Sequence, residues 1–247
     1  NNGDNIAHKN YNYSETSFHY WYWKNILNQN LKNDWFGMCQ YRRYFVKYEY
    51  KDLIKNSAGM QGYYPFINNF NDLEKILQKE PSPEWNGFDV ILCEPWSVAV
   101  NSKMKLLKRG IKSIINDPLI LFDKKKHNIK LHFEMFHGYD NLNKAINVMD
   151  KKDKKDFLNY ISENNMLSGH CIFFSNNTKL INNFYTDLFD WLFKCESIFG
   201  FNLKGYDNQR IYSFLTERYT PFWFNKYAKV KYWPWVYCDI TKFETNY

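Results

Sequence analysis

The chain has 247 residues, of which 45% are apolar and 20% aromatic, a composition that excludes a disordered polymer and suffices for a sizeable core. Its formal net charge of +7 fits lysines on a solvated surface, and it also favours anionic partners such as nucleotide phosphates, nucleic acid or an anionic membrane. Five scattered cysteines without a C-x-x-C pair argue against a disulfide framework and a zinc knuckle, and they indicate a reducing, cytosolic setting.

The first predicted helix follows a polar, turn-rich segment at residues 1–13. Ser14 is a suitable N-cap, and no Gly or Pro interrupts the chain from there to residue 27. Four side chains at helical spacing form one face of this helix: Thr16, Tyr20, Trp23 and Leu27.

Three apolar or aromatic segments are predicted as strands. Residues 35–45 are rich in aromatic side chains and contain the adjacent pair Arg42 and Arg43. Residues 87–96 are a short apolar run bounded by Gly and Pro, which is typical of a buried strand. Residues 166–175 form the third strand.

The segment at residues 101–115 is predicted as an amphipathic helix. Its apolar side chains share one face: Met104, Leu107, Ile111 and Ile114. Its basic side chains spread over the other: Lys105, Lys108, Arg109 and Lys112. An ordinary surface helix with solvated lysines is the first interpretation, and a helix that binds a membrane surface or an acidic ligand is the alternative.

The remaining helices are predicted at residues 71–78, after Tyr139, at residues 178–199, and from residue 206 to a stop at Pro221. Residues 228–240 are expected to form a terminal strand or an extended tail. Strands that alternate with helices predict an α/β fold with a largely parallel sheet, in one domain over residues 1–247.

Arg42 and Arg43 stand at the end of their predicted strand, where ligands of such sheets bind. Adjacent strand residues point to opposite faces, so one arginine is expected to contact a phosphate. The other is expected to pair with a carboxylate such as Glu15 or Glu217. Structural salt bridges for both arginines are the alternative.

Several common active-site motifs are missing from the sequence. It contains neither G-x-x-x-x-G-K-[ST] nor G-x-G-x-x-G, which argues against a P-loop NTPase and a dinucleotide enzyme. It also lacks H-E-x-x-H, G-x-S-x-G and the RNA-recognition core motif. Nucleic acid is therefore not an expected partner, and no signal peptide is visible.

Six segments in chain order together resemble a known family: "GDNIAHKN", "YSETSFHYWYWKN", "GMCQYRRYF", "NNMLSG", "DLFDWLF" and "QRIYSFLTERY". They are similar to bacterial capsular-polysaccharide and O-antigen biosynthesis proteins with the motif H-Y-R-R-Y-F, formerly a domain of unknown function. Some members of that family are glycosyltransferases, including galactofuranosyltransferases. The resemblance covers essentially the whole chain.

The sequence departs from the family pattern in three places. Gln40 stands where the family has His. Residues 96–130 fit the pattern poorly, which indicates an insertion or a divergent loop. The family usually carries a first strand before the G-D-N-I motif, and we expect this chain to lack it. The resemblance implies a GT-A-like, Rossmann-like fold.

The resemblance implies transfer of a sugar, with galactofuranose as one candidate, from a UDP-sugar to a polysaccharide or lipid-linked acceptor. This work would take place in the cytoplasm, at the inner face of the plasma membrane. The alternative is a sugar-binding or assembly module without catalysis. Most GT-A enzymes hold Mn²⁺ or Mg²⁺ through D-x-D, but "QYRRYF" stands here, so arginines are expected to replace the metal's charge.

The resemblance also implies candidate residues. Those expected to bind the nucleotide-sugar are Asp4, Asn5, Lys9, Lys24, Tyr41, Arg42, Arg43, Asn165, Gly169 and His170. Those expected to act as the catalytic base on the acceptor hydroxyl are Glu15, Asp140, Asp207 and Glu217. Turn formation, helix capping and salt bridges are the alternative roles for these side chains.

Overall fold

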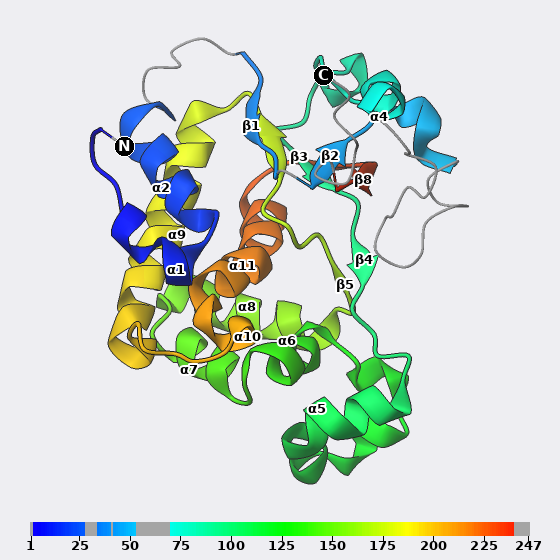
Figure 1. The fold of residues 1–247 in the computed structure, drawn as a ribbon, viewed down its shortest axis with the longest axis vertical. Coiled ribbons are helices and arrows are strands. Elements are labelled where there is room, and N and C mark those ends of the chain that lie inside the picture. The colour runs from blue at the N-terminus through cyan, green and yellow to red at the C-terminus, as the bar shows by residue number, and fades with distance from the viewer. Residues whose placement is uncertain (1, 28–33, 41, 53–69, 240–247) are drawn as a thin grey trace.

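The computed structural model describes residues 2–27, 34–40, 42–52 and 70–239 of the chain (Figure 1). These residues form a mixed α/β fold in which helices flank a four-stranded sheet. The predicted α/β class is therefore confirmed. Tyr41 lies outside the described residues.

The central sheet has the strand order β1-β6-β3-β7. Its strands are β1 (Phe36–Met38), β6 (Phe173–Ser175), β3 (Val90–Cys93) and β7 (Val230–Trp233). β3 is parallel to β7 and places Val90 opposite Val230, whereas β6 is antiparallel to both β1 and β3. The sheet is thus mixed and not largely parallel, because β6 runs against both of its neighbours.

Strand β3 separates two hydrophobic cores. Val90 and Leu92 face the larger core, which helices α2, α6, α7, α8, α9 and α11 complete. Ile91 and Cys93 face the smaller core, which contains Trp85. Successive side chains of a strand point to opposite faces, so an entirely apolar strand such as β3 is buried on both sides.

The helices carry most of the larger core (Figure 1). Their bounds are α1 (Asn10–Tyr13), α2 (Thr16–Asn25), α4 (Phe70–Ile76), α5 (Lys103–Asn116), α6 (Ile129–His137), α7 (Asn141–Asn147), α8 (Lys151–Glu163), α9 (Thr178–Phe199), α10 (Tyr206–Gln209) and α11 (Ile211–Tyr227). Short 3₁₀ turns lie at η1 (Ala7–Lys9), η3 (Tyr48–Tyr50), η4 (Pro83–Trp85), η5 (Pro118–Leu121) and η6 (Lys124–Lys126). Within the described ranges no helix is long and apolar enough to cross a bilayer.

The predicted strand at residues 35–45 is divided into two strands that belong to different sheets. β2 (Arg43–Phe45) pairs with β8 (Trp235–Tyr237) in a separate two-stranded sheet. The division arises at a turn in which the Arg43 N–H donates to the Gln40 carbonyl over 3.2 Å. The arginines therefore follow a turn and do not end a strand of the central sheet.

The predicted strand at residues 166–175 is divided in the same way. β5 (Met166–Leu167) pairs with β4 (Trp96–Ser97), and β6 joins the central sheet. His170 and Cys171 lie between β5 and β6 with φ angles of 124° and 53°, a conformation that cannot continue a strand.

Four helical segments differ from the sequence prediction. α1 occupies part of the segment predicted as polar turns, and both α6 and α8 were missed. The lysine-rich start of α8 is typical of a solvated surface segment and hid the helical pattern. Phe157 and Ile161, one turn apart in this helix, are fully buried. α11 continues past the predicted stop at Pro221, because the following side chains, Phe222, Trp223 and Phe224, are buried in the larger core.

Helix α5 buries a different face from the one expected. Leu106, Gly110, Ser113 and Ile114 are buried, whereas Met104 is 76% exposed. The buried side chains pack on Leu131 and Met135 of α6 in a small separate core. Figure 1 shows α5 at one end of the molecule's long axis.

A substitution at Gly37 of β1 tests how closely β1 and β6 approach each other. A Cβ atom at this position would lie 2.1 Å from the Phe173 carbonyl oxygen, so we expect Gly37→Ala to lower the free energy of unfolding by about 2 kcal/mol or more. The matched control is Gly110→Ala in α5, where the nearest atoms belong to flexible Leu106 and Met135 side chains. In urea unfolding, the control should be as stable as the unmodified protein or more stable, since alanine favours helix. Equal stability of the two variants would contradict the pairing of β1 with β6.

Candidate functional site

Three residues predicted from sequence meet through Gln40. The Gln40 side-chain amide donates to Glu15 Oε1 over 3.0 Å and to the His170 carbonyl oxygen over 2.6 Å. Arg43 Nη1 donates a short hydrogen bond to Gln40 Oε1. Glu15 precedes α2, Gln40 and Arg43 flank the turn before β2, and His170 lies between β5 and β6. Segments far apart in the chain thus contribute to one polar cluster.

Helix α11 carries a second polar group, an ion pair whose cation is buried. Arg218 Nη1 donates to Glu217 Oε2 over 2.7 Å; the Arg218 side chain is 2% exposed and that of Glu217 is 19% exposed. The other guanidinium nitrogen, Nη2, lies 3.2 Å from His132 Nδ1 and 3.3 Å from His137 Nε2, both on α6. A guanidinium has no acceptor, so both histidine nitrogens accept from Arg218.

Electrostatic interactions join the two groups. Burial raises the pKa of Glu217, and the Glu15 carboxylate raises it further, while Arg218 and Arg43 oppose this shift. Burial also lowers the pKa of His170 well below its ordinary value, and the charges of Arg43 and Arg218 add to that effect. We refer to Glu15, Gln40, Arg43, His170, Glu217 and Arg218 as the charged cluster.

The backbone around the charged cluster is strained. Besides Gly, four described residues have positive φ, and three of them are Ser14 (50°), His170 (124°) and Cys171 (53°). Ser14 directly precedes Glu15, and His170 is itself a member of the cluster. Such conformations persist when surrounding contacts enforce them, and they concentrate at functional sites.

Several buried nitrogens in and beside the cluster remain without a partner in the described part of the chain. Arg43 Nε, Arg218 Nε, His170 Nε2 and the indole Nε1 of Trp96 have no hydrogen-bond partner within the described ranges. The Trp96 ring stacks on His170 with ring centroids 6.1 Å apart. Because an unsatisfied buried polar group destabilises a fold by about 1–3 kcal/mol, these nitrogens are candidates to bind a ligand.

Other predicted nucleotide-sugar residues are engaged elsewhere. Asp4 accepts from the Tyr20 hydroxyl, and Lys9 pairs with Glu196 over 2.7 Å. The Lys24 ammonium lies 3.5 Å from the centroid of the Trp23 ring. These contacts are explained by the packing of the N-terminal segment on α2 and α9.

The two arginines diverge, as their adjacency predicted. Arg42 pairs with Asp239 over 3.4 Å, while Arg43 joins the charged cluster. The arginine that pairs with a carboxylate is thus Arg42, but its partner is neither Glu15 nor Glu217, and Arg43 is linked to Glu15 through Gln40.

Two further predicted residues lie on the chain leading to His170. The exposed Asn165 offers its carbonyl to the Val98 N–H, and the Gly169 carbonyl accepts from the Cys93 thiol. A Cβ at Gly169 would meet Leu167 at 3.1 Å, so this glycine permits close packing behind His170.

The remaining candidate bases make contacts outside the charged cluster. Asp140 precedes α7 and accepts from Asn143, and Asp207 in α10 pairs with Arg109 over 3.2 Å. The sequence interpretation missed Arg218, His132, His137 and Trp96. The one sequence feature that could have indicated Arg218 is its position directly after Glu217 in "LTERY".

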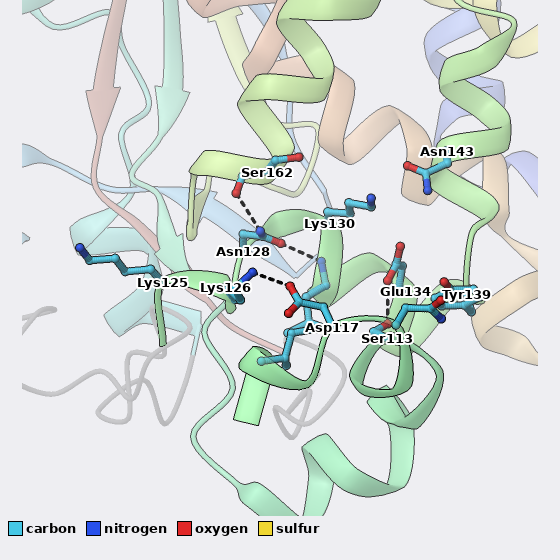
Figure 2. Close-up of a pocket in the computed structure, with 13 residues that line it drawn as sticks. Ser113, Asp117, Lys125, Lys126, Asn128, Lys130, Glu134, Tyr139, Asn143 and Ser162 are labelled. Carbon is cyan, nitrogen blue, oxygen red and sulfur yellow. Dashed lines mark hydrogen bonds and ion pairs between the residues drawn. The ribbon is translucent and has the colours of Figure 1, made fainter. Parts of the chain in front are cut away.

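Two cavities lie on other parts of the surface. The first, of about 410 Å³, is drawn in Figure 2 and contains the hydrogen bond from Ser113 Oγ to Glu134 Oε2, 2.6 Å long. The second, of about 430 Å³, is lined by Asn5, Phe18 and Trp21, among others. Asn5 is the one predicted site residue among those that line these two cavities. Its side chain accepts from the Ala7 N–H and donates to the Gly3 carbonyl.

The described residues contain no group of three or more His, Cys, Asp or Glu side chains placed to hold a metal ion. Glu15 and Glu217 are the carboxylates of the charged cluster, and Arg43 and Arg218 are its cations. The cluster therefore offers guanidinium donors and two carboxylates, which suit binding of an anion together with proton transfer.

The neutral state of the buried histidines predicts a pH dependence of stability. Burial and Arg218 lower the pKa of His132 to about 3 and that of His137 to about 2. Below the ordinary value of 6.5 the unfolded chain binds more protons, so the free energy of unfolding should fall as pH decreases. We expect a loss of roughly 2 kcal/mol per histidine at pH 5, partly offset by Glu217.

Urea unfolding at pH 7 and pH 5 measures this loss. His137→Gln, which retains an acceptor for Arg218, should reduce the difference between the two pH values. The control is His8→Gln at an exposed position of η1, which should leave the difference unchanged. Equal stability of the unmodified protein at both pH values would contradict the buried neutral histidines.

Comparisons with known proteins agree with this fold. The chain is similar to the apo structure of WbbM, a bifunctional glycosyltransferase, with a TM-score of 0.66 and 19% sequence identity. The match covers 97% of this chain and 39% of that chain, so this chain spans about two fifths of that structure's length. A search of curated proteins found no match. The model of a family described as a domain of unknown function (DUF4422) matches residues 1–229, and the chain therefore belongs to that family.

Proposed function

We propose that this protein is a glycosyltransferase whose charged cluster binds the diphosphate of a nucleotide-sugar. The observation that carries the proposal is that Gln40 links Glu15, Arg43 and His170 from separate segments of the chain, with Glu217 within the electrostatic influence of Glu15 and Arg43. The similarity of the fold to that of WbbM supports it.

Arg43 is the proposed diphosphate ligand. Its Nη1 is held by Gln40, whereas its Nε has no partner among the described residues. A guanidinium matches the geometry of phosphate oxygens, and it stabilises the negative charge that develops on the departing diphosphate. The described carboxylates do not form a three-ligand metal group, so we assign no step to a metal.

Glu217 is the proposed base. Burial raises its pKa, which makes its carboxylate a stronger proton acceptor than an exposed glutamate. It would take the proton from the acceptor hydroxyl as that oxygen attacks the sugar carbon and the bond to the diphosphate breaks. Arg218 holds the carboxylate in place and stabilises its ionised form.

The donor, acceptor and pathway follow from the family resemblance. We infer a UDP-sugar donor, with galactofuranose as one candidate sugar, and a polysaccharide or lipid-linked acceptor in capsule or O-antigen synthesis. One domain over residues 1–247 would do this work in the cytoplasm, at the inner face of the plasma membrane.

A sugar-binding module without catalysis is the second candidate. The position of Gln40 favours it, because Gln40 occupies one donor of Arg43 and stands where the resembled motif has His. Such a module would bind UDP or a sugar without releasing UDP from a nucleotide-sugar.

Calorimetry with UDP tests the role of Arg43. Loss of the guanidinium should weaken UDP binding in Arg43→Ala by about tenfold or more, which corresponds to loss of a charge-assisted hydrogen bond. Arg42→Ala is the matched control, since Arg42 contacts Asp239, and its affinity should stay close to that of the unmodified protein. Absence of UDP binding with and without Mn²⁺ would overturn the enzyme proposal, whereas binding that requires Mn²⁺ would overturn only the replacement of metal by arginine.

Release of UDP from UDP-sugars tests Glu217. Glu217→Gln keeps the shape and removes the base, so the rate should fall by about 100-fold or more while UDP affinity stays unchanged. Asp207→Asn is the control among the other candidate bases, because Asp207 is an exposed partner of Arg109. A loss of rate in Asp207→Asn equal to that in Glu217→Gln would contradict the assignment.

A further inference from the structure

The segment from α5 to η6, Lys103–Lys126, leaves an unusual number of large apolar side chains exposed to water. The most exposed are Met104 (76%), Ile115 (72%) and Phe122 (83%). The others in the same segment are Leu107, Ile111, Leu119 and Leu121. We call these seven side chains the apolar ridge.

The helical part of the apolar ridge forms one continuous strip. Met104, Leu107, Ile111 and Ile115 follow one another at intervals of three or four residues, so they lie along one side of α5. The neighbouring side of α5, with Leu106 and Ile114, packs on α6. The apolar surface of α5 is thus wider than its contact with the protein, and the fold leaves the outer half uncovered.

The same segment carries nearly all of the protein's net charge. Its 24 residues include eight Lys or Arg and two Asp, a net charge of +6, out of +7 for the whole chain. Lys108 and Lys112 are exposed and lie one turn apart beside Ile111 and Ile115. Lys124 and Lys125 are exposed just after Phe122.

We propose that the Lys103–Lys126 segment is a peripheral binding site for an anionic lipid bilayer, with the apolar ridge inserted at the level of the headgroups. An exposed apolar strip edged by lysines is the pattern of a helix that lies in the membrane interface. Lysine stems cover apolar surface while their ammonium groups reach the anionic headgroups. Nucleic acid would account for the charge and not for the apolar ridge, whereas an anionic bilayer accounts for both.

The location of the segment suits this role. α5 stands at one end of the molecule (Figure 1), and its covered side is anchored to α6 by Leu106, Ile114, Ile120, Leu131 and Met135. A bilayer at this end would contact the ridge while the sheet and the remaining helices stay in water.

Helix α6 connects this surface to the charged cluster. Its Leu131 and Met135 pack against α5, while its His132 and His137 contact Arg218. A membrane-bound α5 would thus hold the cluster at a set distance from the lipid surface. The binding of lipid itself is independent of the proposed sugar transfer.

Flotation with lipid vesicles tests this inference on the full chain. The protein should float with vesicles that contain phosphatidylglycerol, bind phosphatidylcholine vesicles much more weakly, and lose binding as salt concentration rises. The double variant Ile115→Ser/Phe122→Ser removes two of the most exposed apolar side chains, and its partitioning should fall by about tenfold or more. Lys108→Glu/Lys112→Glu should abolish the preference for the anionic vesicles.

The matched control is Leu158→Ser/Ile198→Ser, which removes exposed apolar side chains from α8 and α9 and should bind vesicles like the unmodified protein. Circular dichroism of each variant separates loss of lipid binding from loss of folding. Failure of the unmodified protein to float with anionic vesicles would overturn the inference. Equal losses of vesicle binding in the control and in Ile115→Ser/Phe122→Ser would also overturn it. The same holds if the apolar ridge mediates self-association, seen as oligomers that dissociate in Ile115→Ser/Phe122→Ser and do not bind lipid.

Discussion

The buried guanidinium of Arg218 is the interaction on which the charged cluster depends. A cation removed from water destabilises a fold unless its donors are satisfied, and here Glu217, His132, His137 and the Phe214 carbonyl satisfy the two terminal nitrogens, Nη1 and Nη2. These partners belong to α6 and α11, so the two helices cannot move apart without exposing an unpaired buried charge. Burial, together with the same charge, keeps both histidines neutral, which preserves them as acceptors.

This constraint also determines the state of Glu217. The carboxylate is held by Arg218 on one side and lies within the electrostatic influence of Glu15 and Arg43 on the other. Pro221 has no N–H to donate to the carbonyl four residues earlier, which is that of Glu217. The helix therefore has a weakened backbone at the residue that carries the candidate base, while the buried aromatic residues after Pro221 keep it continuous.

The backbone reversal at His170 and Cys171 supplies a backbone contact of the charged cluster. Because both residues have positive φ, the chain leaves β5, turns the His170 carbonyl toward Gln40 and enters β6 antiparallel to β3. Gln40 then links this backbone to Glu15 and Arg43. The strained reversal is thus connected through Gln40 to the position of Arg43.

The sequence alone determined the α/β class, the buried strand β3 and the long helix α9, and it predicted Glu15, Arg43, His170 and Glu217 as candidate site residues. Those features depend on local periodicity and on motifs that can be read along the chain. Tertiary structure decided which arginine joins the cluster, that Arg218 is its buried cation, and which side of α5 stays exposed. Such outcomes depend on contacts between segments far apart in sequence and on the strained turn at residues 170–171, neither of which leaves a periodic signal in the residues themselves.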